Sequence, residues 1–556
     1  MKQRAWVAGV AIVLGSIVCT NVTGAPRNGA RDEGGTTIRG RVLNSVTKEP
    51  ISRALVVLQG ANAATFTDDR GQFELTLAEK KGAESGGVRM RLGGGLIEVR
   101  KPGFLQGRRL PMIRYTTGPQ PEAVIHLIPE AFIVGHVEVP GSEGDVRIQC
   151  ELYRRAVNEG RETWTALPPF STFVDGEFRF SELEAGTYKL ITREQVDPDS
   201  MPNGQMYAYP PVYYPNTTDF SLATPITVKA GETARVNLAV ARQKYYRVKI
   251  AVANMPLGGG LNSVVYPMGH HSPGWSLGYN PGEEAIMGSL PDGNYTVEAR
   301  AQGEGSMTGI LNFSVKGAPV EGPTLTLVPD ATIAVKVREE FESGQSNFVT
   351  LQTMPENSPP NARRFTNVHV NLTLMDELNL FQQNASAQLP EGSQGQELTI
   401  ANVGPGRYAV EVTSGVGYAA SVQSGGKDLM HHAMVVGLGG GVAPIEVVLR
   451  DDGAKIDGEL EEGSGGTNLE EARTIYLVPV GETGGQPRTM QAWQGKFTIE
   501  QVPPGDYLAV AFAQQPDNLA YGTEEGTQAL LKRGGKMIHL EAKQNVSVKL
   551  QLSEEE

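Results

Sequence analysis

The stretch GKFTIEQVPPGDYLAVAF, from Gly495 to Phe512, decides the fold of this 556-residue chain. Phe497 and Ile499 alternate with polar residues, which is the pattern of a half-buried β-strand. A Pro-Pro-Gly turn follows, and the apolar residues after Tyr507 predict a second strand. Glycine supplies the positive φ of a tight turn, and the tyrosine can bury its ring while its hydroxyl bonds to an upstream backbone group. The stretch therefore predicts a strand pair closed by a tyrosine corner.

The same pattern occurs four times along the chain. In each copy a tyrosine follows an aliphatic residue by five positions, and a glycine lies two positions before the tyrosine. The pairs are Leu183 and Tyr188, Leu290 and Tyr295, Val403 and Tyr408, and Val502 and Tyr507. The tyrosines are about 100 residues apart, which is the length of one Greek-key β-sandwich. We therefore predict a structural tyrosine corner in each of four consecutive sandwiches.

Alternating strands also meet at the junctions between these units, as in Thr324 to Val337 and Ile445 to Leu460. With one further unit before the first repeat, the pattern predicts an all-β tandem array of about five Ig-like or transthyretin-like Greek-key sandwiches. The expected segments are a signal peptide at 1–24, a linker at 25–36, and sandwiches at 37–129, 130–243, 244–330, 331–452 and 453–553. Short linkers favour a semi-rigid array. Glu524 to Gly534 is the one segment that predicts a helix, a short one within a loop.

The N-terminus has the pattern of a secretory signal. Lys2 and Arg4 precede an apolar run, Ala5 to Cys19, that is too short to span a bilayer comfortably. Small residues before Ala25 allow cleavage there, while a retained anchor or a lipid-modified cysteine is the alternative. We expect an exported protein in the periplasm, at the cell surface or outside the cell, without a transmembrane segment after cleavage.

Composition excludes some classes of partner. The net charge is −13, and no basic cluster suggests a nucleic-acid surface, so we expect no nucleic-acid partner. After cleavage Cys150 is the one remaining cysteine, so no intramolecular disulfide is possible. The 67 glycines and 35 prolines lie between short apolar runs, which indicates many strands and turns.

The first unit, Thr37 to Leu77 and beyond, resembles the carboxypeptidase regulatory-like domain, a transthyretin-like seven-stranded β-sandwich. The matching residues are Gly40, Val42, Pro50, Ala54 to Leu58, the hairpin Thr65 to Phe73, and Ile97 to Phe104. In the hairpin, Asp68, Asp69 and Gly71 are expected to form the turn. The other four units look like divergent relatives. The resemblance implies a carbohydrate-binding-like fold with a binding or scaffold role.

Sequence motifs for catalysis, metals or cofactors are weak, and we predict none of the three. Gly274 to Gly278 matches G-x-S-x-G around Ser276, but the following Pro-Gly blocks the helix that a nucleophile elbow needs. None of the eight histidines lies in an H-x-x-E motif. The remaining candidates are interpreted as surface histidines, turn aspartates and a glycine loop without a following helix: His270, His271, His431, His432, Asp451, Asp452 and Gly437 to Val442.

One stretch suggests a binding surface. Asn203 to Thr218 contains four tyrosines and three prolines within a few residues. Aromatic rings on a stiffened loop can stack on sugars or on partner side chains. The predicted binding residues are Tyr207, Tyr209, Tyr213 and Tyr214. The competing interpretation is that the loop folds over its own sandwich.

Taken together, the sequence predicts an exported, non-catalytic tandem β-sandwich protein. It would bind carbohydrate or envelope and extracellular proteins, or act as a structural spacer. Two alternatives stay open at this point: an accessory component of an outer-membrane uptake or secretion system, and a hydrolase with an unrecognised active site. The latter would need clustered, buried acids or bases with perturbed pKa values.

Overall fold

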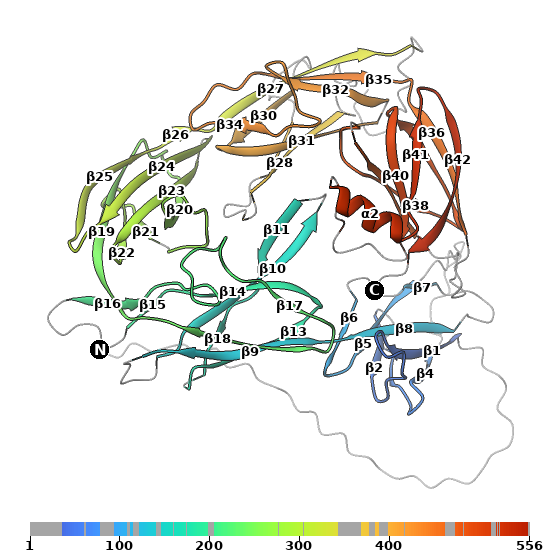
Figure 1. Ribbon diagram of the computed structural model, residues 1–556, viewed down its shortest axis with the longest axis horizontal. Coiled ribbons are helices and arrows are strands. Elements are labelled where there is room, and N and C mark those ends of the chain that lie inside the picture. The colour runs from blue at the N-terminus through green and yellow to red at the C-terminus, as the bar shows by residue number, and fades with distance from the viewer. Residues whose placement is uncertain are drawn as a thin grey trace, which may run out of the picture. The chain divides into compact units, whose positions relative to one another are not determined.

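The computed structural model describes residues 36–553, apart from 60–62, 78–93, 108–111, 115–121, 141–145, 159–160, 174, 198–204, 276, 304, 343–367, 377, 379–383, 388–397, 416, 462–472, 482, 513–518, 520 and 522. The predicted signal peptide and nearly all of the predicted linker lie outside this part. The chain divides into two compact units, Met1–Pro129 and Glu130–Glu556. It is all-β, and the predicted tandem array of sandwiches is confirmed (Figure 1). No helix in the described part is long and apolar enough to cross a membrane.

The first unit is one sandwich. Its sheets have the orders β4 (Gln72–Leu77), β1 (Thr36–Asn44), β8 (Ala123–Pro129), β6 (Phe104–Gln106), and β3 (Ala63–Phe66), β2 (Leu55–Leu58), β5 (Gly94–Arg100), β7 (Met112–Arg114). Phe73 and Ile97 lie in the core between them. The Asp68 carboxylate accepts hydrogen bonds from the backbone N–H groups of Arg70 at 2.9 Å and Gln72 at 2.7 Å. The predicted turn role of Asp68 is therefore confirmed.

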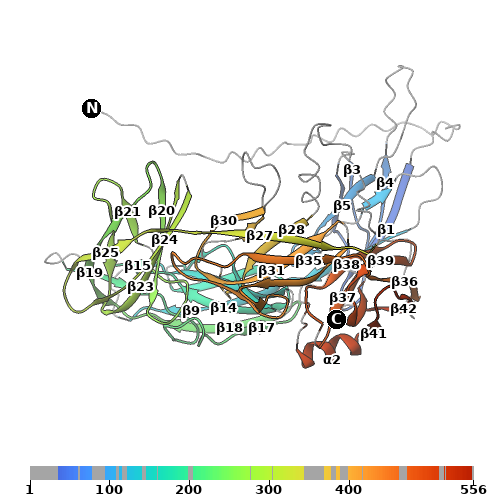
Figure 2. The same ribbon diagram turned by 90° about the horizontal axis from the view of Figure 1, so that it is seen from above.

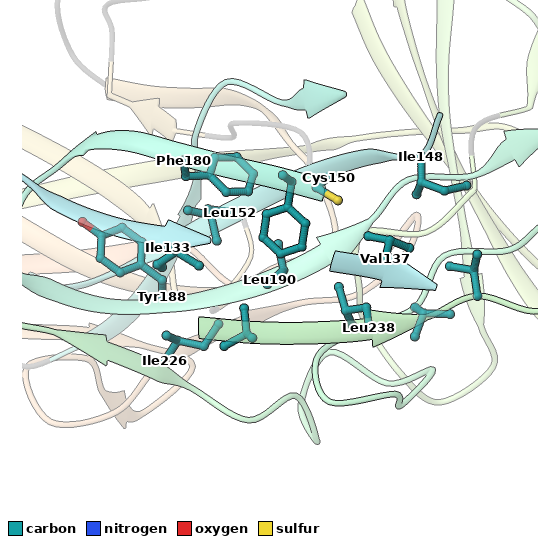
Figure 3. Close-up of a cluster of buried hydrophobic side chains, with 14 of the residues drawn as sticks. Ile133, Val137, Ile148, Cys150, Leu152, Phe180, Tyr188, Leu190, Ile226 and Leu238 are labelled. Carbon is teal, nitrogen blue, oxygen red and sulfur yellow. The ribbon is translucent and has the colours of Figure 1, made fainter. Parts of the chain in front are cut away.

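The second sandwich opens the other unit. Its sheets are β11 (Arg161–Ala166), β10 (Gln149–Asn158), β14 (Gly186–Thr192), β17 (Ile226–Val228), with β12 (Phe170–Ser171) on β10, and β13 (Glu177–Leu183), β9 (Ala131–Glu138), β18 (Thr233–Ala239). Figure 3 shows the core between the layers, where Ile133, Leu152 and Leu190 pack beside Tyr188. Alternation along β13 places Phe178 and Phe180 on the same buried face.

The third and fourth sandwiches repeat the plan. The third has the sheets β15 (Gln195–Val196), β16 (Met206–Tyr209), β19 (Gln243–Ala253), β22 (Ala285–Leu290), β21 (Gly278–Asn280), with β25 (Val320–Thr326) on β19, and β20 (Gly260–Pro267), β23 (Gly293–Gly303), β24 (Gly305–Val315), β26 (Val328–Pro329). The fourth has β30 (Leu398–Val403), β27 (Ala331–Glu340), β35 (Ile445–Arg450), β32 (Tyr418–Ser424), β33 (Lys427–Asp428), and β29 (Asn384–Ser386), β28 (Val368–Leu374), β31 (Gly406–Ser414), β34 (Met434–Val436). Each encloses its own apolar cluster.

The fifth sandwich joins its layers into one sheet. The strand order is β38 (Arg488–Ala492), β37 (Arg473–Pro479), β40 (Gly505–Phe512), β42 (Asn545–Ser553), β36 (Ala454–Glu461), β39 (Lys496–Val502), with β41 (Lys536–Leu540) on β40. The helix α2 (Glu524–Lys532) lies beside β40 (Figure 1), and Figure 2 shows it at the lower end of this sandwich. Its Leu530 packs with Leu508 and Phe512. Thr523 caps this helix by accepting a hydrogen bond from the Gly526 N–H at 3.1 Å. The predicted helix is confirmed.

Two relationships recur between sandwiches. In all five, the first strand lies parallel to a late strand: β1 to β8, β9 to β18, β19 to β25, β27 to β35 and β36 to β42. In three of them, a glycine of that first strand lies opposite a phenylalanine of the neighbouring antiparallel strand. These pairs are Gly40 and Phe73, Gly135 and Phe178, and Gly458 and Phe497. The glycine leaves room for the ring to lie across the strand.

Four tyrosine hydroxyls donate to the backbone carbonyl four residues earlier. The pairs are Tyr188 and Glu184 at 2.7 Å, Tyr295 and Pro291 at 2.9 Å, Tyr408 and Gly404 at 2.9 Å, and Tyr507 and Pro503 at 2.9 Å. All four rings are buried. Ring burial and the returning hydrogen bond are the two components of a tyrosine corner.

Candidate functional site in the aromatic insertion

The tyrosine- and proline-rich stretch from Asn203 to Thr218, here called the aromatic insertion, links the second sandwich to the third through backbone pairing. Within it, β16 pairs antiparallel with β19, with Met206 opposite Tyr245 and Ala208 opposite Gln243. The two-residue β15 pairs with β16 on its other side. The insertion therefore extends a sheet of the third sandwich (Figure 1), although it follows strands of the second.

The four predicted binding tyrosines do not form one exposed surface. Tyr209 and Tyr213 are 1 % and 2 % exposed, and Tyr207 and Tyr214 are half-buried. Tyr209 lies in the core of the second sandwich, and Tyr214 packs against that core. Burial leaves Tyr209 and Tyr213 without an exposed ring face on which a ligand could stack. A ligand role stays a prediction for Tyr207 and Tyr214.

Tyr213 and Tyr207 each have a polar partner that fixes the ring. The Tyr213 hydroxyl donates to the Pro273 carbonyl of the third sandwich. The Arg242 guanidinium lies 4.2 Å from the centre of the Tyr207 ring and also pairs with Asp197. One face of Tyr207 is therefore occupied by a cation–π contact.

Beside Tyr213 lies a buried lysine that sequence reasoning missed. Lys189 is buried, and its Nζ donates to the Phe220 carbonyl at 2.8 Å. The ammonium lies 4.3 Å from the centre of the Phe220 ring and 4.7 Å from that of Trp164. Leu378 of the fourth sandwich packs into the same cluster as Trp164 and Phe220. Lys189 thus holds together the aromatic cluster that Leu378 joins, and its place within the apolar strand 186–192 was the available sequence signal.

A second polar group lies where the insertion meets the third sandwich. The Glu194 carboxyl lies near the Tyr245 hydroxyl. The Tyr245 oxygen also accepts a hydrogen bond from Trp275 Nε1 at 3.4 Å. Burial raises the pKa of Glu194 to about 7, against the smaller effect of the Tyr245 hydroxyl. A carboxyl poised near neutrality in a structural joint was not recognisable from the sequence.

A third polar group lies between the third and fourth sandwiches. Glu298 is buried, and Tyr266 donates to its carboxylate at 3.3 Å, while His271 Nε2 lies 4.0 Å from the same oxygen. Burial raises the pKa of Glu298, against the opposing effect of His271, and Asp376 of the fourth sandwich raises it further. The Arg300 guanidinium pairs with Asp330 at 3.1 Å. This arrangement has the acids and bases of a reactive site, but the contacts described here all join strands and loops of the scaffold.

The other sequence candidates are found in structural contacts or lie outside the described part. Ser276 lies outside it. His270 pairs with Asp219 of the second sandwich at 2.6 Å, and His431 pairs with Asp428 at 2.6 Å. Asp452 accepts a hydrogen bond from the Tyr418 hydroxyl at 2.8 Å. Within the described residues no group of three or more His, Cys, Asp or Glu side chains is arranged to hold a metal ion.

Comparison with known proteins does not assign this chain to a family. No family model matches the chain, and no curated protein matches it. Among solved structures it is similar to the Bacillus anthracis TIE protein, with 14% identity over 53% of this chain and 50% of that one and a TM-score of 0.16. It is also similar to the Streptococcal ancillary pilin (11% identity, 53% and 100% of the chains, TM-score 0.16). A third is BcpA, the major pilin subunit of Bacillus cereus (11% identity, 76% and 99%, TM-score 0.14).

Proposed function

We propose that the chain is an exported, non-catalytic tandem β-sandwich protein that acts as a structural spacer at the cell envelope and presents its surface to carbohydrate or protein. The observation that carries this proposal is the sheet in which β16 of the insertion pairs with β19 of the next sandwich. Backbone pairing across a joint restricts bending, because a change of angle would break ladder hydrogen bonds. A spacer needs joints of this kind.

The following joints are also held by specific contacts. Between the third and fourth sandwiches, Arg300 donates to the Asn402 carbonyl at 2.9 Å, and the Ser306 N–H donates to the Asn402 side chain at 3.0 Å. Between the fourth and fifth, Lys543 pairs with the Glu342 carboxylate, and the Glu342 backbone is itself held by its N–H bond to Asp451 of the fourth sandwich at 2.8 Å. Each contact is modest alone, but together they favour one angle at each joint.

Distances between spin labels test the spacer role. With labels at Glu321 of the third sandwich and Glu446 of the fourth, we expect a distance distribution as narrow as that of a control pair, Gln302 and Glu321, within one sandwich. Asn402→Gly keeps the left-handed backbone of Asn402 (φ 60°) but removes its side chain, and should broaden only the first distribution. A broad distribution in the unaltered protein would show a freely jointed chain and contradict the spacer role.

The binding part of the proposal now rests on Tyr207 and Tyr214, the two half-buried rings of the insertion. A glycan array and a pull-down from envelope extract, each with the chain beginning at Ala25, test it. Retention that is lost in Tyr207→Ala or Tyr214→Ala, at unchanged melting temperature, supports a binding surface. Retention that survives both changes places the ligand elsewhere, and an absence of any retained glycan or protein leaves the spacer role alone.

Export has its own test. N-terminal sequencing of the protein from fractionated cells should begin at Ala25, in the periplasmic, surface or extracellular fraction. Recovery from the cytoplasm with Met1 intact would contradict the proposal.

A further inference from the structure

The outer face of one sheet in the second sandwich presents two exposed arginines. The sheet consists of β13, β9 and β18, with β9 in the middle (Figure 1). Val134 of β9 lies opposite Arg179 of β13 on one side and opposite Arg235 of β18 on the other. Among the residues that the structure describes, no carboxylate forms an ion pair with either arginine. The row is therefore a pair of cations with an apolar residue between them.

The other four sandwiches each have an ion pair on the outward face of the first strand. The pairs are Arg39 with Glu74 at 3.3 Å, Lys249 with Glu283 at 2.6 Å, Arg338 with Glu340 at 2.8 Å, and Glu459 with Lys496 at 3.8 Å. In the fifth sandwich a similar row has Glu459 between Lys496 and Lys549, so an acid neutralises the two cations. The second sandwich has valine at the middle of its row, which leaves both arginines available to an anion from outside.

The apolar residues of β9 hold one arginine in place and lie open beside both. The Arg179 guanidinium lies 4.4 Å from the centre of the Phe132 ring. Stacking of this kind fixes the guanidinium plane and leaves the N–H groups along its edge free to bind a carboxylate with two hydrogen bonds. Phe132 and Val134 are half-buried. Because β9 separates the two arginines, their backbones lie two strand spacings apart, roughly 10 Å.

We propose that this face binds an acidic polysaccharide, whose carboxylates pair with Arg179 and Arg235 while its sugar rings lie over Phe132 and Val134. The inference rests on the binding part of the proposed function, and it names the class of ligand and the place. The net charge of −13 repels a polyanion from the chain as a whole, which favours a face with unpaired cations. Glu177 lies two residues before Arg179 on β13, opposite His136, so an acid bounds the face at that end.

The position of β9 favours a polysaccharide over an acidic protein segment. Since β9 is paired on both sides, its backbone groups cannot take up an added peptide strand. What the row offers instead is a flat apolar surface with charged donors on both sides. A polymer of uronic acids presents carboxylates and the apolar faces of its rings along one chain, and it matches both features.

Affinity electrophoresis of the chain that begins at Ala25, in gels with and without alginate, tests the proposal. Alginate, a polymer of uronic acids, should retard the protein at low salt, and the retardation should fall as salt is added. Dextran, a neutral polysaccharide, should have no effect. The double change Arg179→Gln and Arg235→Gln should weaken alginate binding by about tenfold or more, because charge-assisted hydrogen bonds are lost. The matched control, Lys496→Gln with Lys549→Gln, removes the same charge from the row of the fifth sandwich and should leave binding unchanged.

The melting temperature of each variant shows whether it still folds. If the double arginine change lowers it, Arg235→Gln alone tests the face without disturbing the contact between Arg179 and Phe132, and it should still weaken binding. The proposal is overturned if alginate does not retard the protein, if both double variants lose binding equally, or if poly-L-glutamate binds as well as alginate. Alginate binding that survives the arginine changes but is lost in Tyr207→Ala would also overturn it, while leaving the proposed function of the insertion intact.

Discussion

Gly458 of β36 lies directly opposite Phe497 of β39, and the ring fills the space where a side chain at Gly458 would be. A Cβ at Gly458 would lie 2.0 Å from the ring Cζ. Gly458→Ala should therefore lower the free energy of unfolding of the fifth sandwich by about 1–3 kcal/mol, the usual cost of overpacking. Urea unfolding, followed by the fluorescence of Trp493 in the β38–β39 turn, measures this loss of stability.

Gly260→Ala, where a Cβ meets nothing within 4 Å, is the control for Gly458→Ala. An equal loss in both variants would contradict the steric account, and Phe497→Leu should restore part of the stability of Gly458→Ala.

The hydroxyl of Tyr507 should be worth less than its ring. Tyr507→Phe removes one hydrogen bond, to Pro503 at 2.9 Å, and should cost about 1 kcal/mol of stability. Tyr507→Ala also leaves a cavity in the core and should cost about 3–5 kcal/mol. Thermal and urea unfolding measure both changes. Equal, negligible effects would remove the corner assignment.

Glu182 has a left-handed backbone conformation, which suits asparagine better than glutamate. Its φ is 57°, where the ladder between β13 and β9 shifts register. The left-handed region costs an ordinary L-residue about 1–2 kcal/mol, while asparagine tolerates it better. Glu182→Asn should therefore stabilise the second sandwich by up to about 1 kcal/mol. Glu177→Asn, earlier on β13, should not stabilise it, and a gain in melting temperature from both changes would point to charge rather than backbone.

The Cys150 thiol should be unreactive in the folded protein. It is buried, and burial raises its pKa to about 12. Since the thiolate is the nucleophile, almost none is present at neutral pH. In a chain that begins at Ala25, labelling with a thiol reagent at about pH 8 should be far slower in the native state than in denaturant. Similar rates in the two states would show that this core opens readily.

The aromatic insertion should divide into structural and peripheral tyrosines. Tyr209→Ala should cost about 3–5 kcal/mol, because the ring lies in the second core. Tyr207→Ala should cost less, since that ring is half-buried and its main contact is with Arg242. Differential scanning calorimetry of the two variants checks the order. The reverse order would mean that Tyr207, not Tyr209, anchors the insertion.

The sequence predicted those parts of the fold that depend on neighbouring residues. A corner needs only its turn glycine and its tyrosine, as in Gly505 and Tyr507, and both lie within a few positions of each other. The hairpin around Asp68 and the helix after Thr523 were predictable for the same reason. The exact sandwich boundaries and the resemblance to the carboxypeptidase regulatory-like family remain predictions.

The joints could not be predicted, because their partners are distant in sequence. The Asn402 side chain accepts a hydrogen bond from the Ser306 N–H, and the Tyr213 hydroxyl donates to the Pro273 carbonyl. No local sequence pattern marks either pair. The cluster of tyrosines and prolines in the insertion is equally typical of an exposed binding loop and of a loop whose rings are buried against the sandwich. The register of β16 on β19, which decides between them for Tyr209, is not encoded in the insertion alone.

The parallel pairing of first and late strands has a mechanical consequence. Because the two strands run in the same direction, the chain enters each sandwich near one pole and leaves near the other. A pull applied through the neighbouring sandwiches would slide these strands along each other, and the ladder would resist with all of its hydrogen bonds at once. An antiparallel pair of terminal strands would instead be peeled apart from one end, so that its hydrogen bonds would break one after another. In each sandwich the two strands that would carry the tension, the first and a late one, are therefore already hydrogen-bonded to each other.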